Sequence, residues 1–424
     1  MPRDIWEEYG YRRNPFEPRA LSATGEDADL FVGRKREVEE LATWYASNRS
    51  GGIIVEGPIG VGKTTLVNIA QHRAHQHNKK LLPCLKTVEI QNGMTPQGFL
   101  LEVLAHILYS LGKVDAKASK SAGFQELGQT VERGVLTSRG WQAQGSILGS
   151  GGGGGYQATK APTQPDALTM MAVQGYLERF LHLANGRGFD RVLVSVNNLD
   201  IVDLQAFKGL LHAVRDSTLT LENFLWTFIG PVGLRGELTE PSMQRVSELL
   251  RGAPLELEPL SRPQVHEVVK ARLKLYQASP KAIRPVEDEV VEFLYDASSG
   301  EIRYVMNRCG DIVEAVTRHL PSPTTVNLEK ARWVLRDIVA PSIEHAGLKA
   351  KERDVLRQIA AKRRVQGKDF ADYGFNQYQA LFNHISSLAA KRLLVKERSG
   401  RDVVYAPRGD VVLYFEANPF GPYV

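Results

Sequence analysis

A glycine-rich run near the N-terminus constrains the fold of this chain more than any other feature of its sequence. The run Gly57-Pro58-Ile59-Gly60-Val61-Gly62-Lys63-Thr64-Thr65 fits the pattern G-x-x-x-x-G-K-[ST]. It lies between an apolar run, Ile53-Ile54-Val55, and an amphipathic stretch that begins at Leu66. This context predicts a loop between a buried strand and a helix N-terminus, where backbone N–H groups and the helix dipole favour the phosphates of a nucleotide.

The residue types in this loop suit a bound triphosphate. Gly60 and Gly62 allow backbone angles and a close approach that a side chain would prevent. Lys63 is expected to reach the β- and γ-phosphates, and the hydroxyl of Thr64 is expected to bind Mg²⁺. The sequence therefore predicts ATP or GTP with Mg²⁺ as the cofactor, held by Pro58, Ile59, Gly60, Val61, Gly62, Lys63, Thr64 and Thr65.

The composition is that of a globular protein with room for several domains. The chain has 424 residues, of which 43% are hydrophobic and 24% charged, enough for two or three domains. Its two cysteines, Cys84 and Cys309, are far apart and follow no metal-ligand spacing. No stretch reaches the roughly 18 apolar residues of a membrane span, and the N-terminus lacks a secretion signal. We expect a cytoplasmic protein with no membrane partner.

The order of segments predicts an α/β fold followed by helices. Strands are expected near 53–55, 81–90, 191–200 and 224–229 with helices between them, which indicates a parallel sheet with helices on both faces. We expect four parts: an N-terminal arm over 1–30, a P-loop ATPase core over 31–255, an all-helical lid over 256–342 and a C-terminal domain over 346–424.

Two segments leave alternatives open. The arm should pack on the next domain, and its Trp6, Tyr9, Tyr11 and Phe16 either cover their own domain or clasp a neighbouring subunit. An insert at about 134–165 contains five consecutive glycines and has too much backbone entropy for an ordinary sheet interior. It is either a flexible tether or a hairpin that contacts DNA, a neighbouring subunit or a protein partner.

The C-terminal domain predicts a winged helix. Helices are expected at 351–361, 369–373 and 376–391, followed by a hairpin of strands 393–398 and 403–405. Residues 346–424 hold 14 Lys and Arg against eight Asp and Glu, so this region carries the basic character of a chain whose net charge is +5. In such a fold the third helix enters the major groove of duplex DNA. The alternative is a winged helix that serves only protein contacts or autoinhibition.

The expected DNA contacts divide into two kinds. Polar side chains on the outward face of the third helix are of types that bond base edges, and basic side chains nearby would meet phosphates. The first kind comprises Gln377, Gln379, Asn383, His384 and Ser387, and the second includes Lys391, Lys396, Arg398 and Arg401.

The order of these parts resembles the extended AAA+ ATPases, and within them the replication-origin recognition ATPases and the signal-transducing STAND ATPases. The resemblance rests on Phe31-Val32-Gly33-Arg34 before the P-loop, the P-loop itself, the strand at 192–200 and Gly300-x-x-Arg303. It implies that Phe31, Val32, Gly33 and Arg34 border the adenine and that Arg303 touches the γ-phosphate and closes the lid. The alternative is that Arg303 is an ordinary arginine on the surface of a helix. No N-K-x-D guanine motif is present, which favours ATP.

The resemblance also implies self-association. Arg245 and Arg251 lie where these families carry an arginine finger that is supplied to a neighbouring subunit's nucleotide. The alternative is that either arginine is simply a solvated charge on a helix.

The chain departs from the family pattern at the end of the third strand. Asn197 and Asn198 occupy the positions of a Mg²⁺-orienting Asp and a water-activating Glu. An amide carries no charge and cannot accept a proton near neutral pH, so we expect slow hydrolysis unless Asp200 or Asp203 substitutes. Asp200 is alternatively the cap of the following helix. The sequence predicts a nucleotide-switched, DNA-binding protein, with a signalling ATPase or an inactive ATPase subunit as the alternatives.

Overall fold

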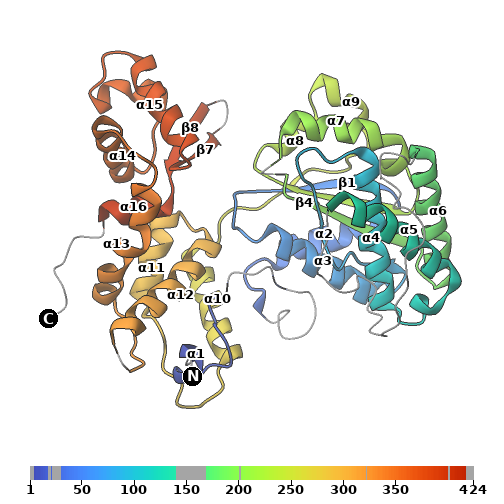
Figure 1. Ribbon diagram of the computed structural model, residues 1–424, viewed down its shortest axis with the longest axis horizontal. Coiled ribbons are helices and arrows are strands. Elements are labelled where there is room, and N and C mark those ends of the chain that lie inside the picture. Colours follow the sequence, from blue (N-terminus) through green and yellow to red (C-terminus); the bar gives the residue numbers. More distant parts are fainter. Residues whose placement is uncertain are drawn as a thin grey trace. The chain divides into compact units, whose positions relative to one another are not determined.

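The computed structural model describes residues 4–17, 21, 30–139, 169–199, 202–320, 322–399 and 402–416. The chain divides into two compact units (Figure 1). One unit consists of Met1–Arg19, Asp29–Gly33 and Pro259–Val424, and the other of Ala20–Ala28 and Arg34–Glu258. No described helix has the length and apolar content needed to cross a membrane.

A parallel sheet forms the centre of the unit that contains the P-loop. Its three main strands are β1 (Gly51–Glu56), β4 (Arg191–Asn197) and β5 (Phe224–Gly230). The strand order is β2-β4-β5-β1-β6, in which the edge strands are β2 (Leu81–Leu82) and β6 (Leu255–Glu256). All strand pairs in this sheet are parallel, as the alternation of strand and helix predicted. The crossover order places β5 between the P-loop strand β1 and β4, whose end carries the two asparagines.

The edges of the sheet differ from the expectation. The single strand expected over 81–90 is two short strands, β2 (Leu81–Leu82) and β3 (Val88–Glu89), which pair with opposite ends of β4. Pro83 follows β2 directly and has no N–H to donate to a ladder, so the strand ends there. At the other edge, β6 (Leu255–Glu256) pairs with β1, and the sequence analysis did not expect it.

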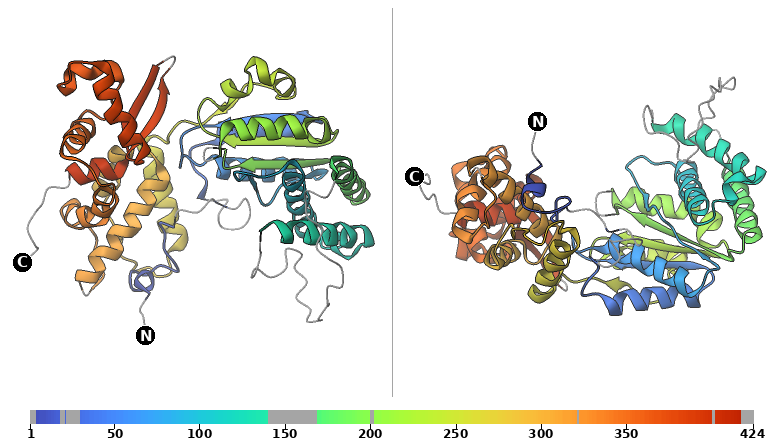
Figure 2. Two further views of the ribbon diagram at one scale, coloured as in Figure 1. Left: turned by 45° about the horizontal axis from the view of Figure 1, so that its top comes forward. Right: turned by 90° about the horizontal axis from the view of Figure 1, so that it is seen from below.

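Helices cover both faces of this sheet because its central strands are apolar on both sides. Trp226 and Phe228 of β5 belong to the core with α4, α6 and α7, whereas the intervening Thr227 bonds to Tyr45 of α2 at 2.7 Å. Figure 2 shows α2 and α3 on one side of the sheet. The helices of this unit are α2 (Lys35–Ser47), α3 (Lys63–His77), α4 (Pro96–Val114), α5 (Ala122–Arg139), α6 (Met170–Gly186), α7 (Leu204–Val214), α8 (Leu234–Leu238) and α9 (Gln244–Ser247).

Residues 4–17 of the N-terminal arm pack on the helices after residue 259, which corrects our expectation for them, whereas Leu21 bonds to α3 in the domain next in sequence. Tyr11 forms an antiparallel bridge with Gln277, and the hydroxyl of Tyr9 donates to the carbonyl of Thr324 at 2.8 Å. Its aromatic side chains gain burial there. The elements involved are α1 (Ile5–Glu8), α10 (Arg262–Tyr276), α11 (Asp288–Ser298), α12 (Ile302–His319) and α13 (Leu328–Glu344).

The C-terminal segment contains three helical pieces, a hairpin and a last helix. Its core includes Leu356 and Ile359 of the first helix with Leu381 and Ile385 of the third. The last helix, α16, was not expected from the sequence, and it packs on α11, α13 and α14. The elements are α14 (Ala350–Lys362), the 3-10 helix η6 (Gly367–Tyr373), α15 (Tyr378–Ala390), β7 (Leu394–Ser399), β8 (Asp402–Pro407) and α16 (Gly409–Glu416).

Candidate functional site

The glycine-rich loop joins β1 to α3 as the sequence predicted. Gly60 and Gly62 have φ angles of 81° and 94°, in the left-handed region that favours glycine. Gly62 is the N-cap of α3, and a Cβ added there would meet no heavy atom within 4 Å. A Cβ on Gly57 would lie 2.5 Å from the carbonyl oxygen of Leu257. The loop is therefore open at the helix N-terminus and closely packed at its start, which fits an anion at its helical end.

Lys63 is the first residue of α3 and lies over the loop. The side chain is 8% exposed, and its Nζ donates to the carbonyls of Gly57 and Pro58 at 2.8 Å each. Thr64 follows and is half-buried. The ammonium group and the helix N-terminus together supply the positive potential that a triphosphate requires. The Thr64 hydroxyl is a type of ligand that Mg²⁺ accepts.

Thr65 has a structural contact that the sequence analysis did not foresee. Its hydroxyl accepts a hydrogen bond from the backbone N–H of Leu21 at 3.2 Å, and Asn68 donates to the carbonyl of Leu21 at 3.3 Å. Leu21 is 7% exposed. These bonds attach residue 21 to the first turns of α3.

Arg34 is a buried cation that contacts the P-loop at Val61. Its Nη2 donates to the carbonyls of Val61 at 3.2 Å and Glu258 at 2.6 Å, and Nη1 pairs with Glu37 at 3.4 Å. Burial lowers the pKa of its guanidinium, and the Glu37 carboxylate partly offsets this. The other expected adenine neighbours, Phe31, Val32 and Gly33, are half-buried and belong to the other compact unit.

Glu56 is a buried carboxylate directly before the P-loop that the sequence analysis missed. It ends β1, is 4% exposed, and accepts a hydrogen bond from the backbone N–H of Arg235 at 3.0 Å at the start of α8. Burial raises the pKa of Glu56, while backbone donors around Arg235 act in the opposite direction. The signal that could have revealed it is the glutamate itself, an ionisable residue at the end of a buried apolar strand.

The end of β4 carries amides in place of the acidic pair. Asn197 and Asn198 are both half-buried, and Asn198 has a φ of 66°, a left-handed angle that asparagine tolerates. Asp203 is the N-cap of α7, and its carboxylate accepts from the N–H of Ala206 at 2.8 Å. The cap of this helix is therefore Asp203 and not Asp200. Asp200 lies outside the described residues.

The three arginines expected to reach a nucleotide from other segments are exposed. Arg303 is the second residue of α12, Arg245 lies in α9, and Arg251 follows it at the edge of the sheet. The backbone N–H of Arg251 donates to the carbonyl of Gly52 at 2.8 Å, so its position follows β1.

The third helix of the C-terminal segment presents part of the expected polar face. Gln377, Gln379 and Asn383 are exposed, and Gln379 donates to Asn383 at 2.9 Å. His384 is half-buried, with its ring 5.3 Å from that of Phe375. Tyr378, which the sequence analysis did not single out, is 48% exposed on the same helix.

Ser387 and Lys391 face α14 and not outward, which corrects the expectation for both. The hydroxyl of Ser387 donates to Glu352 at 2.6 Å, and the ammonium of Lys391 donates to the same carboxylate at 2.8 Å. Glu352 is 5% exposed, and these donors, Lys391 first, lower its pKa to about 2. A buried carboxylate requires such partners, so it holds both side chains within the module.

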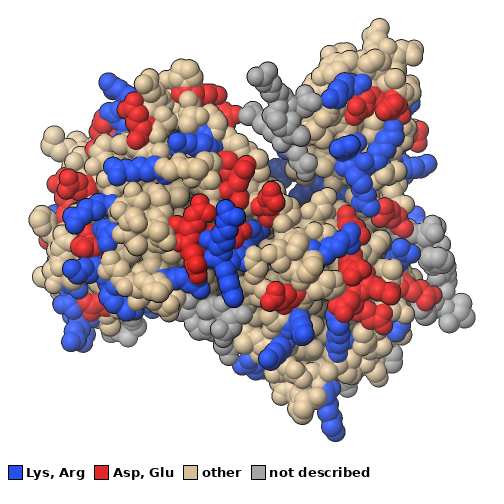
Figure 3. Space-filling model, turned by 180° about the vertical axis from the view of Figure 1, so that it is seen from behind, with Lys and Arg blue, Asp and Glu red and all other residues tan. Residues whose placement is uncertain are grey.

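The basic wing residues are only partly described. Lys396 on β7 is exposed, the side chain of Arg398 lies outside the described atoms, and so does the whole of Arg401. Most of the insert expected at 134–165 is likewise outside the described residues. On the face in Figure 3, Lys and Arg lie among Asp and Glu in both units and form no uniformly basic area.

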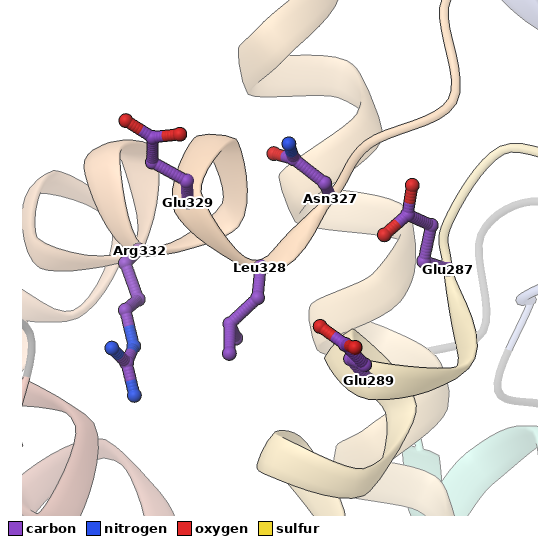
Figure 4. Close-up of a pocket in the computed structure, with 6 residues that line it drawn as sticks. All are labelled: Glu287, Glu289, Asn327, Leu328, Glu329 and Arg332. Atoms are coloured by element: carbon purple, nitrogen blue, oxygen red, sulfur yellow. The ribbon is translucent and has the colours of Figure 1, made fainter.

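A separate pocket of about 440 Å³ lies among the helices after residue 259, at the starts of α11 and α13 (Figure 4). Three of its lining side chains are carboxylates, so its charge opposes a nucleotide's phosphates. The lining residues are Glu287, Glu289, Asn327, Leu328, Glu329 and Arg332. Among the described pockets and loops, the P-loop remains the region that fits a triphosphate.

Comparison with known proteins supports the fold. No protein-family model matches the sequence, and no curated protein matches it. The Walker-type ATPase of Pyrococcus abyssi is a similar solved structure, with a TM-score of 0.51 and 12% identity over 95% of this chain and 99% of that one. This likeness and the observed sheet confirm the predicted α/β fold, a parallel sheet with helices on both faces and a glycine-rich loop after its first strand.

Two archaeal structures are also similar over most of their length. The ORC2 protein of Aeropyrum pernix, in ADPNP–ADP complexes, has a TM-score of 0.48 and 13% identity over 96% of this chain and 97% of that one. The ORC1 protein of the same organism, in complex with DNA, has a TM-score of 0.44 and 14% identity over 92% of this chain and 94% of that one.

Proposed function

We propose that the chain is an ATP-binding switch protein that hydrolyses ATP slowly and binds duplex DNA through a C-terminal winged helix. The observation that carries the first part is the loop between β1 and α3, with two left-handed glycines and a buried lysine at the helix N-terminus. The α/β fold supports it, because ligands of open parallel sheets bind at the carboxyl ends of the strands.

In this proposal Lys63 binds the β- and γ-phosphates and Thr64 holds Mg²⁺, with Asp200 as a further acidic neighbour of the metal. Phe31, Val32 and Gly33 border the adenine. Bound Mg²⁺ would neutralise charge on the phosphates. Lys63 exchanges its carbonyl partners at Gly57 and Pro58 for phosphate oxygens, which are stronger acceptors because they are charged.

Slow hydrolysis follows from the groups at the ends of β4 and β1. Asn197 and Asn198 offer amides where a carboxylate base would be needed, and general-base catalysis typically contributes about 10²–10⁴-fold. Glu56 is a carboxylate nearby in sequence, but its oxygen already accepts the N–H of Arg235. We therefore expect ATP binding, more than turnover, to set the conformation.

The exposed arginines supply the remaining parts of the switch. Arg303 at the start of α12 would contact the γ-phosphate when the lid closes on a triphosphate. Arg245 and Arg251 would reach the nucleotide of a neighbouring copy, which makes self-association part of the proposal.

The proposed DNA surface is the exposed face of α15 and the hairpin. Gln377, Gln379 and Asn383 can bond base edges, with His384 beside them, and Lys396, Arg398 and Arg401 would contact phosphates. Tyr378 adds an exposed aromatic ring to the same helix. Ser387 and Lys391 are not part of this surface because Glu352 holds them.

Nucleotide binding is tested with a fluorescent ATP analogue. We expect Lys63→Ala to weaken binding at least tenfold, whereas Lys79→Ala, an exposed lysine just beyond the C-terminal end of α3, should bind as the wild type does. Equal binding by Lys63→Ala, or Lys63-dependent turnover of many ATP molecules per second, would show that the proposed switch is wrong.

DNA binding is tested by mobility shift with duplex DNA, with and without ATP, at two salt concentrations. We expect a shift that ATP alters and that the triple substitution of Gln377, Gln379 and Asn383 by alanine weakens. Light scattering with and without ATP measures self-association. No shift at low salt would exclude the DNA-binding half of the proposal.

A signalling ATPase is the second candidate, and one observation favours it. Ser387 of α15 and Lys391, the C-cap residue that follows it, are held internally by Glu352, which reduces the groups available to DNA. In that case the C-terminal module and the insert would bind a protein partner. The same mobility-shift experiment separates the candidates, since only the first predicts ATP-dependent binding to duplex DNA.

A further inference from the structure

The buried Arg34 contacts both ends of the main segment of the P-loop unit, residues 34–258. Gly33 is the last residue of one unit and Arg34 the first of the next, while Glu258 is the last residue of the P-loop unit before Pro259. Arg34 donates to the carbonyl of Glu258 at 2.6 Å. The Arg34 side chain therefore links the point where the chain enters the P-loop unit to Glu258, where the chain leaves it.

The same nitrogen of Arg34 also holds the P-loop. Nη2 has two hydrogens, and it donates one bond to Val61 at 3.2 Å and one to Glu258 at 2.6 Å. Val61 is 2% exposed and Arg34 is 5% exposed, so water cannot readily replace the Val61 carbonyl, whereas Glu258 is exposed and its bond is part-buried. A donor that loses one carbonyl here is left buried and unpaired, which is unfavourable.

The preceding residue is anchored in the other unit. The carbonyl of Gly33 accepts from Gln264 of α10 at 2.8 Å, and a Cβ on Gly33, whose φ is 82°, would approach that side chain to 2.9 Å. Displacement of Arg34 along the chain therefore strains a peptide that α10 holds.

Phosphate binding changes the P-loop end of this arrangement. Lys63 donates to the carbonyls of Gly57 and Pro58, and it would give up these bonds to reach a phosphate. Val61 lies between the two left-handed glycines of the loop and directly before the N-cap of α3, so its peptide would border a phosphate bound there. The carbonyl that Arg34 holds therefore belongs to the turn that would take the anion.

We propose that Arg34 is a positioning residue that couples occupancy of the P-loop to the peptides where the two units join. The inference rests on the proposed function, because it requires a nucleotide at the P-loop. A planar guanidinium can bridge two carbonyls from one nitrogen, and the fixed geometry links their positions. A lysine at this position keeps the charge and could reach both carbonyls, but its rotatable ammonium group does not fix their relative positions as the planar guanidinium does, which Glu37 also holds at Nη1.

The test compares Arg34→Lys with Arg36→Lys, an exposed arginine at the start of α2 that serves as the matched control. Hydrogen exchange of residues 255–262 is measured with and without ATP, beside the affinity for a fluorescent ATP analogue. We expect Arg34→Lys to bind within about threefold of the wild type and to lose at least half of the ATP-dependent change in exchange. Arg36→Lys should keep all of it.

Two outcomes would overturn this inference and leave the proposed function unaffected. Arg34→Lys could retain the full ATP-dependent change, or its affinity could fall more than about tenfold, which would make Arg34 a ligand-binding residue. If the lysine variant is poorly folded, Arg34→Gln, whose amide nitrogen can serve one of the two carbonyls, is measured instead with the same expected loss. A wild-type chain that does not bind ATP overturns the proposed function and this inference together.

Discussion

Three buried ionisable residues, Arg34, Glu56 and Lys63, surround the P-loop, and each is held by backbone groups. Arg34 and Lys63 donate to carbonyls of the loop, and Glu56 accepts from the N–H of Arg235. Buried charges are costly unless they are paired, so each of these contacts restricts the conformation of the loop. Lys63 was predicted from the motif. The role of Glu56 was not, because its partner lies far away in the sequence.

Restoring a carboxylate at Asn198 should accelerate hydrolysis. We expect Asn198→Glu to raise ATP turnover at least about tenfold, since a general base contributes about 10²–10⁴-fold when it is well placed. Because residue 198 has a left-handed φ of 66°, the substitution should also cost about 1 kcal/mol of stability. Steady-state turnover and urea unfolding measure the two effects. Asn185→Glu, an exposed site on α6, is the control. Unchanged turnover with normal ATP binding would contradict the explanation for slow hydrolysis.

Glu352 should make the C-terminal module sensitive to acid. Its pKa is lowered to about 2, so its ionised form stabilises the fold above its ordinary pKa, and this stabilisation disappears as the pH falls through about 2. We expect Glu352→Gln to lower the free energy of unfolding by roughly 1–3 kcal/mol at pH 7 and by progressively less below pH 4. Urea unfolding across this pH range measures the difference, with the exposed Asp354→Asn as control. A difference that is independent of pH would rule out the ion pair as its source.

At the scale of elements, local patterns predicted most helices and the central strands, and the exceptions have tertiary causes. Pro83 divides the expected second strand, and β6 is a two-residue strand that exists through its pairing with β1. The helix α16 was missed although its apolar residues Val411, Val412 and Leu413 are all buried. Its burial comes from α11 and α13 as well as from α14.

One side chain anchors α16 to α12. Asp410 accepts from the hydroxyl of Tyr304 at 2.8 Å and from Arg308 at 2.7 Å, and burial with this carboxylate raises the pKa of Tyr304. We expect Asp410→Asn to destabilise the unit by roughly 1–3 kcal/mol, because a partly buried guanidinium loses one of its two carboxylate partners and keeps only Asp311. Hydrogen exchange of residues 409–416 should increase.

The control for this anchor is Glu416→Gln at the other end of α16. Glu416 pairs with Arg363, and both side chains are 39% exposed, so the loss should be below about 0.5 kcal/mol. Equal effects of the two substitutions would mean that the Asp410 contact adds nothing beyond surface charge.

At the scale of the whole molecule, the basic C-terminal region has a measurable consequence. If the hairpin contacts phosphates, the logarithm of the DNA binding constant falls linearly with the logarithm of salt concentration. We expect Lys396→Ala to reduce the magnitude of this slope by about 1, the value for a single phosphate contact. Binding is measured at four or more salt concentrations. Lys274→Ala on α10, which removes an equal charge from an exposed site, should leave the slope unchanged. Identical slopes for both variants would place Lys396 away from the DNA.

The sequence by itself determined the glycine-rich loop, the parallel α/β core and the amides at the end of β4. These depend on residues that are adjacent in the chain, and the backbone conformation of such short runs follows from local sterics and hydrogen bonding. The tertiary structure decided which polar side chains are free to bind a ligand and which are held in internal contacts. Glu352 holds Ser387 and Lys391, Arg34 joins Val61 to Glu258, and Asp410 holds α16, each through contacts between residues distant in sequence. Burial of a charge selects such partners, and no local pattern encodes which distant group will supply them.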